Sequence, residues 1–403
     1  MAASFARLGT YNAYDTATRN LTTRQNTLSS LQEHITAGKR VLRPSDDPTA
    51  AAQAERAQTR IARVDTDQRA LAMQRNSITA AETTLGEAGD AMQLFREKLV
   101  AAGNGAYNAT DRASIIQELT SLREQIFGYS NRTDSNGIPL FSGLASAAPP
   151  FVDATTGVEY AAIPGQRPNG EVSITPTLDG EAAWMNVPTG NGVFAVEYGA
   201  ANAGTSWADL GQVTNPSALT GNNYSIQFSV NAAGVTTYDV TNTTTGNPVL
   251  AGQPYTSGQA IAFDGMSMMV KGVPKNGDNF AVAPSSKTDV FAVLDKAIAQ
   301  VKAAGPNVGN LTHAITQGLT QMDSSMTRLQ ASRGLAGDLL NRVDRVDASQ
   351  QTRSVQLEAD RTRAEDLDMI KALSDQSNQQ TGYQAALQSY AQIQKLSLFN
   401  YLS

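Results

Sequence analysis

Few residues in this sequence could carry out chemistry, and they are scattered. His34 and His313 are its two histidines, and they lie far apart in the chain. A metal site built on either one would need further ligands close by. The chain has no cysteine, which excludes a disulfide, a thiolate nucleophile and a Cys-ligated metal. We therefore expect both histidines on or beside a helix seam, and no metal or cofactor.

Asp46 and Asp47 are adjacent carboxylates, and such a pair could serve in general acid–base catalysis. Their neighbours favour a different role. Two prolines flank three good N-cap residues, and proline suits the first turn of a helix. We predict that this segment is a rigid elbow that caps a new helix; its residues are Pro44, Ser45, Asp46, Asp47 and Pro48.

Acidic and basic side chains interleave between residues 342 and 368. Their spacing allows ion pairs along one solvated helix face, and the alternative is ion pairing between subunits of an assembly. The sequence contains no P-loop, GxGxxG or GxSxG motif. Residues 144–285 contain no histidine, which removes the usual base of a Ser-His triad from that segment. We therefore expect a structural protein and not an enzyme.

A long helix with a strict heptad pattern is predicted over about 48–102. Apolar residues recur every seven positions at Val64, Leu71, Ile78, Leu85, Met92 and Leu99, with a second row at Ala81, Ala88, Phe95 and Ala102. An unbroken repeat of seven indicates a left-handed coiled-coil seam. We expect a shorter helix before it, ended by Gly38, and a third helix after it, capped by Thr110 and Asp111.

The C-terminal part repeats this design. A stripe with spacings of four and three runs from Leu311 to Val346, which predicts a second long helix. At the chain ends, two helices carry apolar faces that lack a compact domain to cover them. The N-terminal face consists of Leu21, Leu28, Leu31 and Ile35. The C-terminal face consists of Leu387, Tyr390, Ile393, Leu396 and Leu398. We expect these ends to be disordered in the monomer and to order on assembly.

The middle of the chain, about 144–287, is rich in Gly, Pro, Thr and Asn and contains short β-like runs. Strands are predicted over 172–175, 193–198, 224–230, 236–241, 266–270 and 280–282. The fold class expected is therefore mainly α with a β-rich insert: a long coiled-coil helical rod formed by both chain ends, plus an outer antiparallel β domain.

Charge and hydropathy limit the partners. The net charge of -6 gives no indication of nucleic-acid binding, and no apolar stretch approaches the length of a membrane span. The first residues lack the apolar core of a secretory signal peptide. We therefore expect no nucleic acid and no membrane among its partners, and export, if it occurs, without a cleaved signal.

Four motifs resemble the flagellin superfamily, and within it the hook-associated proteins. They are GKRVLRPSDDPTAAA at 38–52, NRTDSNGIPLFSG at 131–143, GVPKNGDNFAVAPS at 272–285 and YQAALQSYAQIQKLSLFNYL at 383–402. The first is shared across the superfamily, and the last is the most specific. Because they lie at both ends and at both insert boundaries, the resemblance covers nearly the whole chain.

The resemblance implies a layered fold. Terminal helices, 1–42 and 367–403, would form an inner tube; a helical rod, 43–143 and 286–366, would surround it; and a β-rich domain, 144–285, would lie outside. It also implies an extracellular subunit of the bacterial flagellum, secreted through the type III apparatus, that joins hook to filament as a homo-oligomeric ring. The implied partners are the first hook-associated protein, flagellin and a cytoplasmic export chaperone that grips the C-terminal face.

Two alternatives remain open. The chain could be another axial component, either a first hook-associated protein or a flagellin. It could also be a secreted coiled-coil effector or adhesin whose insert binds a surface ligand. Addition of the purified protein to isolated hooks would separate the flagellar interpretations from the effector.

Overall fold

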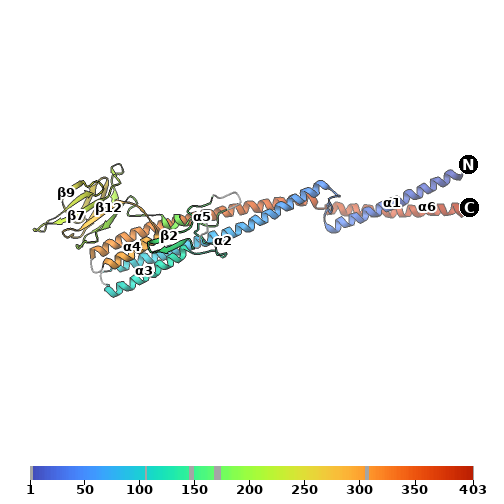
Figure 1. Cartoon of the computed structure of the whole chain (residues 1–403). Helices are drawn as coiled ribbons and strands as arrows, with labels where there is room; N and C mark the ends of the chain where they lie inside the picture. The colour runs from blue at the N-terminus through green and yellow to red at the C-terminus, as the bar shows by residue number, and fades with distance from the viewer. Residues whose placement is uncertain (1–2, 105–106, 145–148, 168–173, 305–307, 403) are drawn as a thin grey trace. The chain divides into compact units, whose positions relative to one another are not determined.

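The computed structural model describes residues 3–104, 107–144, 149–167, 174–304 and 308–402. The chain divides into two compact units, which we describe separately. The end unit comprises residues 1–69 and 347–403, and the central unit comprises residues 70–346. Helices α2 and α5 each contribute to both units. The six helices are α1 (Ala3–Ala37), α2 (Pro48–Ala102), α3 (Ala109–Ser130), α4 (Val290–Ala304), α5 (Val308–Glu365) and α6 (Met369–Leu402) (Figure 1).

The central unit contains the heptad seam, and the structure confirms it. All six residues of the first row and all four of the second are buried. From Leu71 onward they pack with α3, α4 and α5 into one core that also takes in Phe141, Phe151 and Trp184. Val64 belongs to the end unit. Gly318 lets α5 approach closely, because a Cβ there would lie 2.9 Å from a methyl carbon of Leu99. The predicted helix over 48–102 is α2, with the same bounds.

The start of α3 differs from the prediction. Asn108 is the N-cap, and its side chain accepts hydrogen bonds from the backbone N–H groups of Thr110 and Asp111. The backbone N–H of Asn108 in turn donates to Asp111 Oδ2 (3.0 Å), which completes a capping box. The predicted caps Thr110 and Asp111 are therefore wrong by two and three positions, since both residues are already helical.

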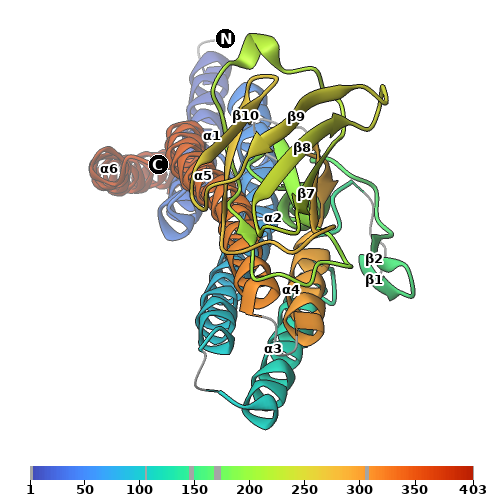
Figure 2. The ribbon, with the colours of Figure 1, turned by 90° about the vertical axis from the view of Figure 1, so that its left-hand side faces the viewer.

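The insert is an antiparallel β domain within the central unit. Its strands are β1 (Phe151–Ala154), β2 (Gly157–Tyr160), β3 (Val187–Pro188), β4 (Phe194–Tyr198), β5 (Trp207–Ala208), β6 (Gln212–Val213), β7 (Tyr224–Val230), β8 (Thr236–Asn242), β9 (Pro248–Pro254), β10 (Ala260–Phe263), β11 (Met266–Lys271), β12 (Asn279–Pro284) and β13 (Lys287–Thr288). A five-stranded sheet has the order β4-β12-β7-β8-β9, and a second has β10-β11-β5 with β6 also on β11. Side chains from both sheets share one core. Figure 2 shows β7, β8 and β9 side by side, with the β1–β2 hairpin separate from them.

Five of the six predicted strands exist, as β4, β7, β8, β11 and β12. The sixth, 172–175, lies partly outside the described residues, and Ile174 and Thr175 are not in a strand. Taken together, the helices at both ends and the central antiparallel sheets confirm the predicted fold class.

The end unit holds a pair of helices. In it, α1 and α6 lie side by side with the chain termini at the same end of the pair (Figure 1). The N-terminal parts of α2 and the C-terminal part of α5 complete this unit. Here α5 continues as one helix to Glu365, through the stretch in which the apolar spacing weakens.

Candidate assembly surface

The elbow between α1 and α2 is built by two aspartates with different roles. Asp47 is the cap of α2: its Oδ1 accepts bonds from the N–H groups of Thr49 (3.1 Å) and Ala50 (3.0 Å). Asp46 instead closes the turn before it, since its Oδ2 accepts from the N–H groups of Leu42 (3.0 Å) and Arg43 (2.8 Å). The backbone bond to Ala50 is the main reason that the pKa of Asp47 lies far below its usual range.

The other elbow residues have smaller parts. Pro48 is the first residue of α2, as proline at N1 should be. Pro44 and Ser45 are exposed in the turn, and no hydrogen bond from the Ser45 hydroxyl occurs in the described part of the chain. Of the three predicted cap residues, only Asp47 caps the helix.

Backbone contacts join the elbow to the end of α5. Gly38, with φ +68°, ends α1, and its carbonyl accepts from the N–H of Leu367 (3.0 Å). The N–H of Arg40 donates to the carbonyl of Glu365 (2.7 Å), and its guanidinium donates to the carbonyl of Ala364 (2.8 Å). The two chain segments that lead to the terminal helices are therefore fastened to each other.

His34 lies at this junction. Its Nδ1 lies 2.9 Å from the carbonyl oxygen of Lys39, just past the end of α1. Among the residues that the structure describes, no group of three His, Asp or Glu side chains could hold a metal ion. Across the same residues, no helix is long and apolar enough to cross a membrane.

The predicted pairing faces of α1 and α6 are only partly covered. Leu21, Leu28, Leu31 and Ile35 are each half-buried. On α6, Tyr390 is half-buried and packs against Tyr14 with the rings tilted, the ring centroids 5.4 Å apart and the two hydroxyls 2.8 Å apart. Leu387 is 42% exposed. The side chains of Ile393, Leu396 and Leu398 lie outside the described residues.

A second apolar cluster at the start of α6 was not among the predicted face residues. Ile370 is 86% exposed and Leu373 is 52% exposed, with Met369 beside them. The helix begins at this point because Asp368 caps it, accepting from the N–H groups of Ile370 and Lys371 (3.1 Å each). Large apolar side chains held open at a capped helix start are suited to contact with another molecule.

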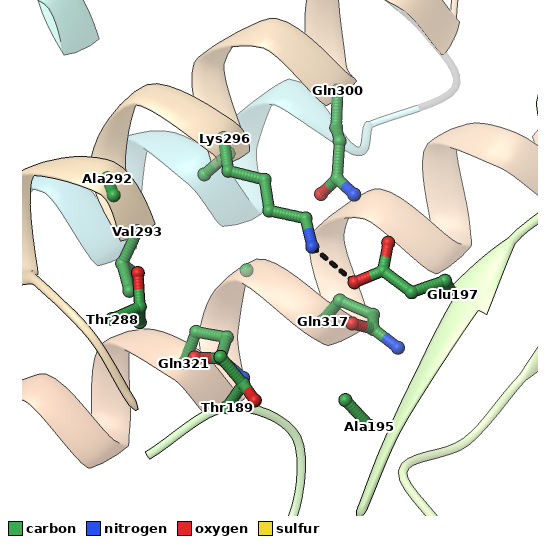
Figure 3. A pocket seen from close by; sticks show the side chains of 12 residues that line it. Thr189, Ala195, Glu197, Thr288, Ala292, Val293, Lys296, Gln300, Gln317 and Gln321 are labelled. Atoms are coloured by element: carbon green, nitrogen blue, oxygen red, sulfur yellow. Dashed lines mark hydrogen bonds and ion pairs between the residues drawn. The ribbon is translucent and has the colours of Figure 1, made fainter. Parts of the chain in front are cut away.

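The β domain is mounted on α4 and α5 around a cavity of about 290 Å³ (Figure 3). Lys296 of α4 pairs with Glu197 of β4 (2.6 Å) across this cavity. Gln317 of α5 donates to the carbonyl of Val196 in β4. Polar groups from three elements thus connect the sheet to the helices within the central unit.

His313 of α5 lies in the same contact between the β domain and the helices. It is 1% exposed, and its ring packs against Tyr198 and Phe280, with centroids 5.3 and 5.9 Å away. Burial lowers the pKa of His313 to about 4, so the ring is neutral at pH 7. We predicted His313 on or beside a helix seam; it lies on α5, with its ring against the β domain.

Arg123 of α3 is a buried charge that sequence reasoning missed. Its guanidinium binds Asp295 of α4 (2.9 Å) and Asp153 of β1, and it lies over the rings of Phe127 and Phe291. Burial opposes its charge, but the two carboxylates more than offset this and raise the pKa of Arg123. Only its position in an apolar stripe, after Leu119 and Leu122, could have indicated burial.

The helical regions of this chain match models of a known protein family. The model of the bacterial flagellin N-terminal helical region matches residues 8–146, and that of the flagellin C-terminal helical region matches residues 319–402. The chain belongs to the flagellin superfamily. In this member of the superfamily, residues 198–284 match the D2-like domain of flagellar hook-associated protein 1.

Two bacterial relatives match part of the chain. Flagellar hook-associated protein 3 of Salmonella typhimurium is 33% identical over 196 residues, and that of Escherichia coli is 30% identical over 196 residues. Each alignment covers 47% of this chain and 56% of the relative. The chain therefore matches little more than half the length of these relatives.

Solved structures match over a larger share. Flagellar hook-associated protein-3 of Legionella pneumophila superposes with a TM-score of 0.68 at 27% identity, over 76% of this chain and 97% of that one. FlgL of Xanthomonas campestris gives a TM-score of 0.65 at 26% identity, over 75% of this chain and 99% of that one.

Proposed function

We propose that this chain is a structural adaptor of the bacterial flagellum, one that joins the hook to the filament as a ring of subunits on the axial lattice. The observation that carries the proposal is the likeness to hook-associated protein-3 of Legionella pneumophila, which extends over 97% of that chain. A solved structure from the same organism is described as the flagellar junction protein and matches over 99% of its length, with a TM-score of 0.66.

The surface described above supports a mechanical role. Apolar side chains of α6 stay uncovered in the single chain, and assembly with other copies would bury them. We retain the predicted faces, Leu21, Leu28, Leu31, Ile35, Leu387, Tyr390, Ile393, Leu396 and Leu398, as assembly residues, and the C-terminal set as the face that an export chaperone would hold. The expected neighbours are the first hook-associated protein on one side and flagellin on the other.

The three-layer division is also part of this proposal. The compact units divide α2 and α5 near residues 69 and 347, whereas the proposed layers change at 42–43 and 366–367. The proposed layer boundaries at 42–43 and 366–367 are supported by the β-bridge between Lys39 and Asp366, because the two chain segments meet there beside the elbow.

A first hook-associated protein is the second candidate, because the β domain matches the D2-like model of that protein. A deletion strain tests whether the chain connects hook and filament. A strain that lacks the adaptor should keep its hooks and release flagellin into the medium. Firmly attached filaments in that strain would exclude the adaptor role.

The direct test is addition to isolated hooks. Purified chain should add to them as a thin layer visible by electron microscopy. Leu387→Asp with Tyr390→Asp should abolish the layer, whereas Gln388→Asp, on the same helix but already exposed and polar, should not. No layer with the unsubstituted chain would contradict the proposal and favour a secreted effector.

A further inference from the structure

A groove of about 510 Å³ lies beside the elbow in the end unit, lined by residues 41–44, the first turns of α2 and the last residue of α5. Its lining is mostly apolar. Val41 and Ala54 are buried there, and Leu42, two prolines and two further alanines complete the apolar part. Alanine and proline side chains are small, so the groove has room for a larger apolar side chain from another molecule.

One carboxylate of this groove has no cation beside it. Arg43 is paired with Glu33 (2.6 Å), and Glu365 is paired with Lys39 (3.1 Å). Glu55 is exposed, and it makes no ion pair with any residue that the structure describes. The groove therefore combines an apolar lining with one unpaired negative charge.

The apolar cluster at the start of α6 carries the opposite charge. Ile370 is 86% exposed and Leu373 is 52% exposed, and Lys371 is exposed between them. Within the described ranges, Lys371 has no acidic partner. Two open apolar side chains beside a free cation are complementary to an apolar groove beside a free carboxylate.

The groove and the cluster are separate surfaces at nearly the same level of the end unit. Glu365, in the groove lining, comes only five residues before Ile370, and the bridge between Lys39 and Asp366 holds the elbow beside this point. Among the described residues that line the groove, none belongs to the cluster. A contact between the two surfaces would therefore set neighbouring copies side by side, displaced along the axis by one or two helical turns, about 5–11 Å.

We propose that Ile370 and Leu373 of one copy of this chain insert into the elbow groove of the next copy, with Lys371 of the first beside Glu55 of the second. The two surfaces differ, so the contact is heterologous, and its repetition by rotation about a common axis closes a ring. Burial of the two apolar side chains stabilises the contact, and the ion pair fixes its register. This inference rests on the proposed assembly function and assigns to it one lateral contact.

Cysteine cross-linking tests the contact, because the chain has no cysteine of its own. The full chain with Ala52→Cys and Leu373→Cys, added to isolated hooks and oxidised, should give a ladder of multimers on a non-reducing gel. The matched control is Ala52→Cys with Asp375→Cys, since Asp375 is also exposed on α6 but lies about 160° round the helix axis from Leu373. The first pair should exceed the control in yield by about tenfold. Equal yields, or a product that stops at the dimer, would overturn the contact.

Charge reversal tests the register in the same assay. Glu55→Lys or Lys371→Glu should each lower the yield of the 52–373 cross-link by about tenfold, because like charges would then face each other. The chain with both substitutions should regain the yield, since the two charges are again opposite. Arg56→Glu, next to Glu55 but outside this groove, should leave the yield unchanged.

The outcomes for this contact and for the proposed function are distinct. A layer on the hooks without the cross-linked ladder, or no recovery in the doubly substituted chain, would overturn the contact alone. Failure of the unsubstituted chain to add to hooks would instead contradict the proposed function.

Discussion

The apolar residues of the α2 heptad row are buried in this molecule, whereas several apolar residues of α6 are exposed. The heptad row of α2 from Leu71 to Leu99 is buried within the single chain, by α3, α4 and α5. On α6, Ile370, Leu373 and Leu387 remain open. An apolar pattern therefore indicates that a face will be covered, but does not say by what. The α2 seam is completed within one copy, and the α6 face awaits a partner.

The largest expected effect comes from the buried seam. Phe95→Ala removes a fully buried ring and should lower the free energy of unfolding by about 3–5 kcal/mol, through lost burial and the cavity that remains. Leu94→Ala, one residue away but exposed, should change it by less than about 0.5 kcal/mol. Urea denaturation followed by circular dichroism measures both. Similar values for the two would remove the distinction between a covered and an uncovered face.

The next largest effect tests how α3, α4 and β1 are joined. Arg123→Ala leaves Asp153 and Asp295 without their shared cation and should cost about 3 kcal/mol, the lower end for a buried pair because both carboxylates are half-exposed. Arg123→Met, which keeps the apolar stem over Phe127 and Phe291, should cost less. The same denaturation experiment decides, and an unchanged midpoint in Arg123→Ala would show that the network contributes nothing.

The packing of the β domain on α5 at His313 should become less stable at low pH. The pKa of His313 falls to about 4 in the folded protein, below its usual value near 6.5, so the unfolded chain binds more protons between these values. The contribution of neutral His313 to the free energy of unfolding is fully present above pH 6.5. It declines as pH falls toward 4, by at most about 3 kcal/mol. His313→Leu should remove this part of the decline. A decline of equal size in that variant would assign the acid sensitivity to other groups.

The smallest effect is expected at the elbow. Asp47→Ala removes the cap of α2 and should lower the melting temperature by a few degrees, whereas Asp47→Asn keeps a cap oxygen and loses only the charge facing Arg40. The pKa of Asp47 is lowered, so its contribution is present above about pH 4 and is lost as pH falls below that. Equal melting of Asp47→Ala and the unsubstituted chain at pH 7 would exclude the cap.

The rod could be read from the sequence because its information is local and periodic. The row at 64, 71, 78, 85, 92 and 99 lies on one helix whatever surrounds it. Strand β9 was missed because Pro248 and Pro254 bound it and Gly252 interrupts it, a composition typical of loops; at the edge of a sheet, prolines are tolerated. The cap at Asn108 was missed because Thr110 and Asp111 are equally good cap residues.

The candidate surface could be predicted only in part. Apolar spacing identified Leu387 and Tyr390, but the exposure of Ile370 depends on where Asp368 starts α6. Likewise Arg123 and His313 owe their burial to segments far away in the chain, to Asp295 and Phe280 respectively. Contacts of this kind are set by tertiary structure and leave no local signal.

Hydrogen exchange, compared between the dilute monomer and the hook-bound layer, tests the central claim most directly. We expect amides of α2 between residues 71 and 99 to be strongly protected in both states. Amides of α1 and α6 should exchange fast in the monomer and become protected on the hook, because their apolar faces are fully covered only there. Strong protection of α1 and α6 in the dilute monomer would contradict the claim that these faces await a partner.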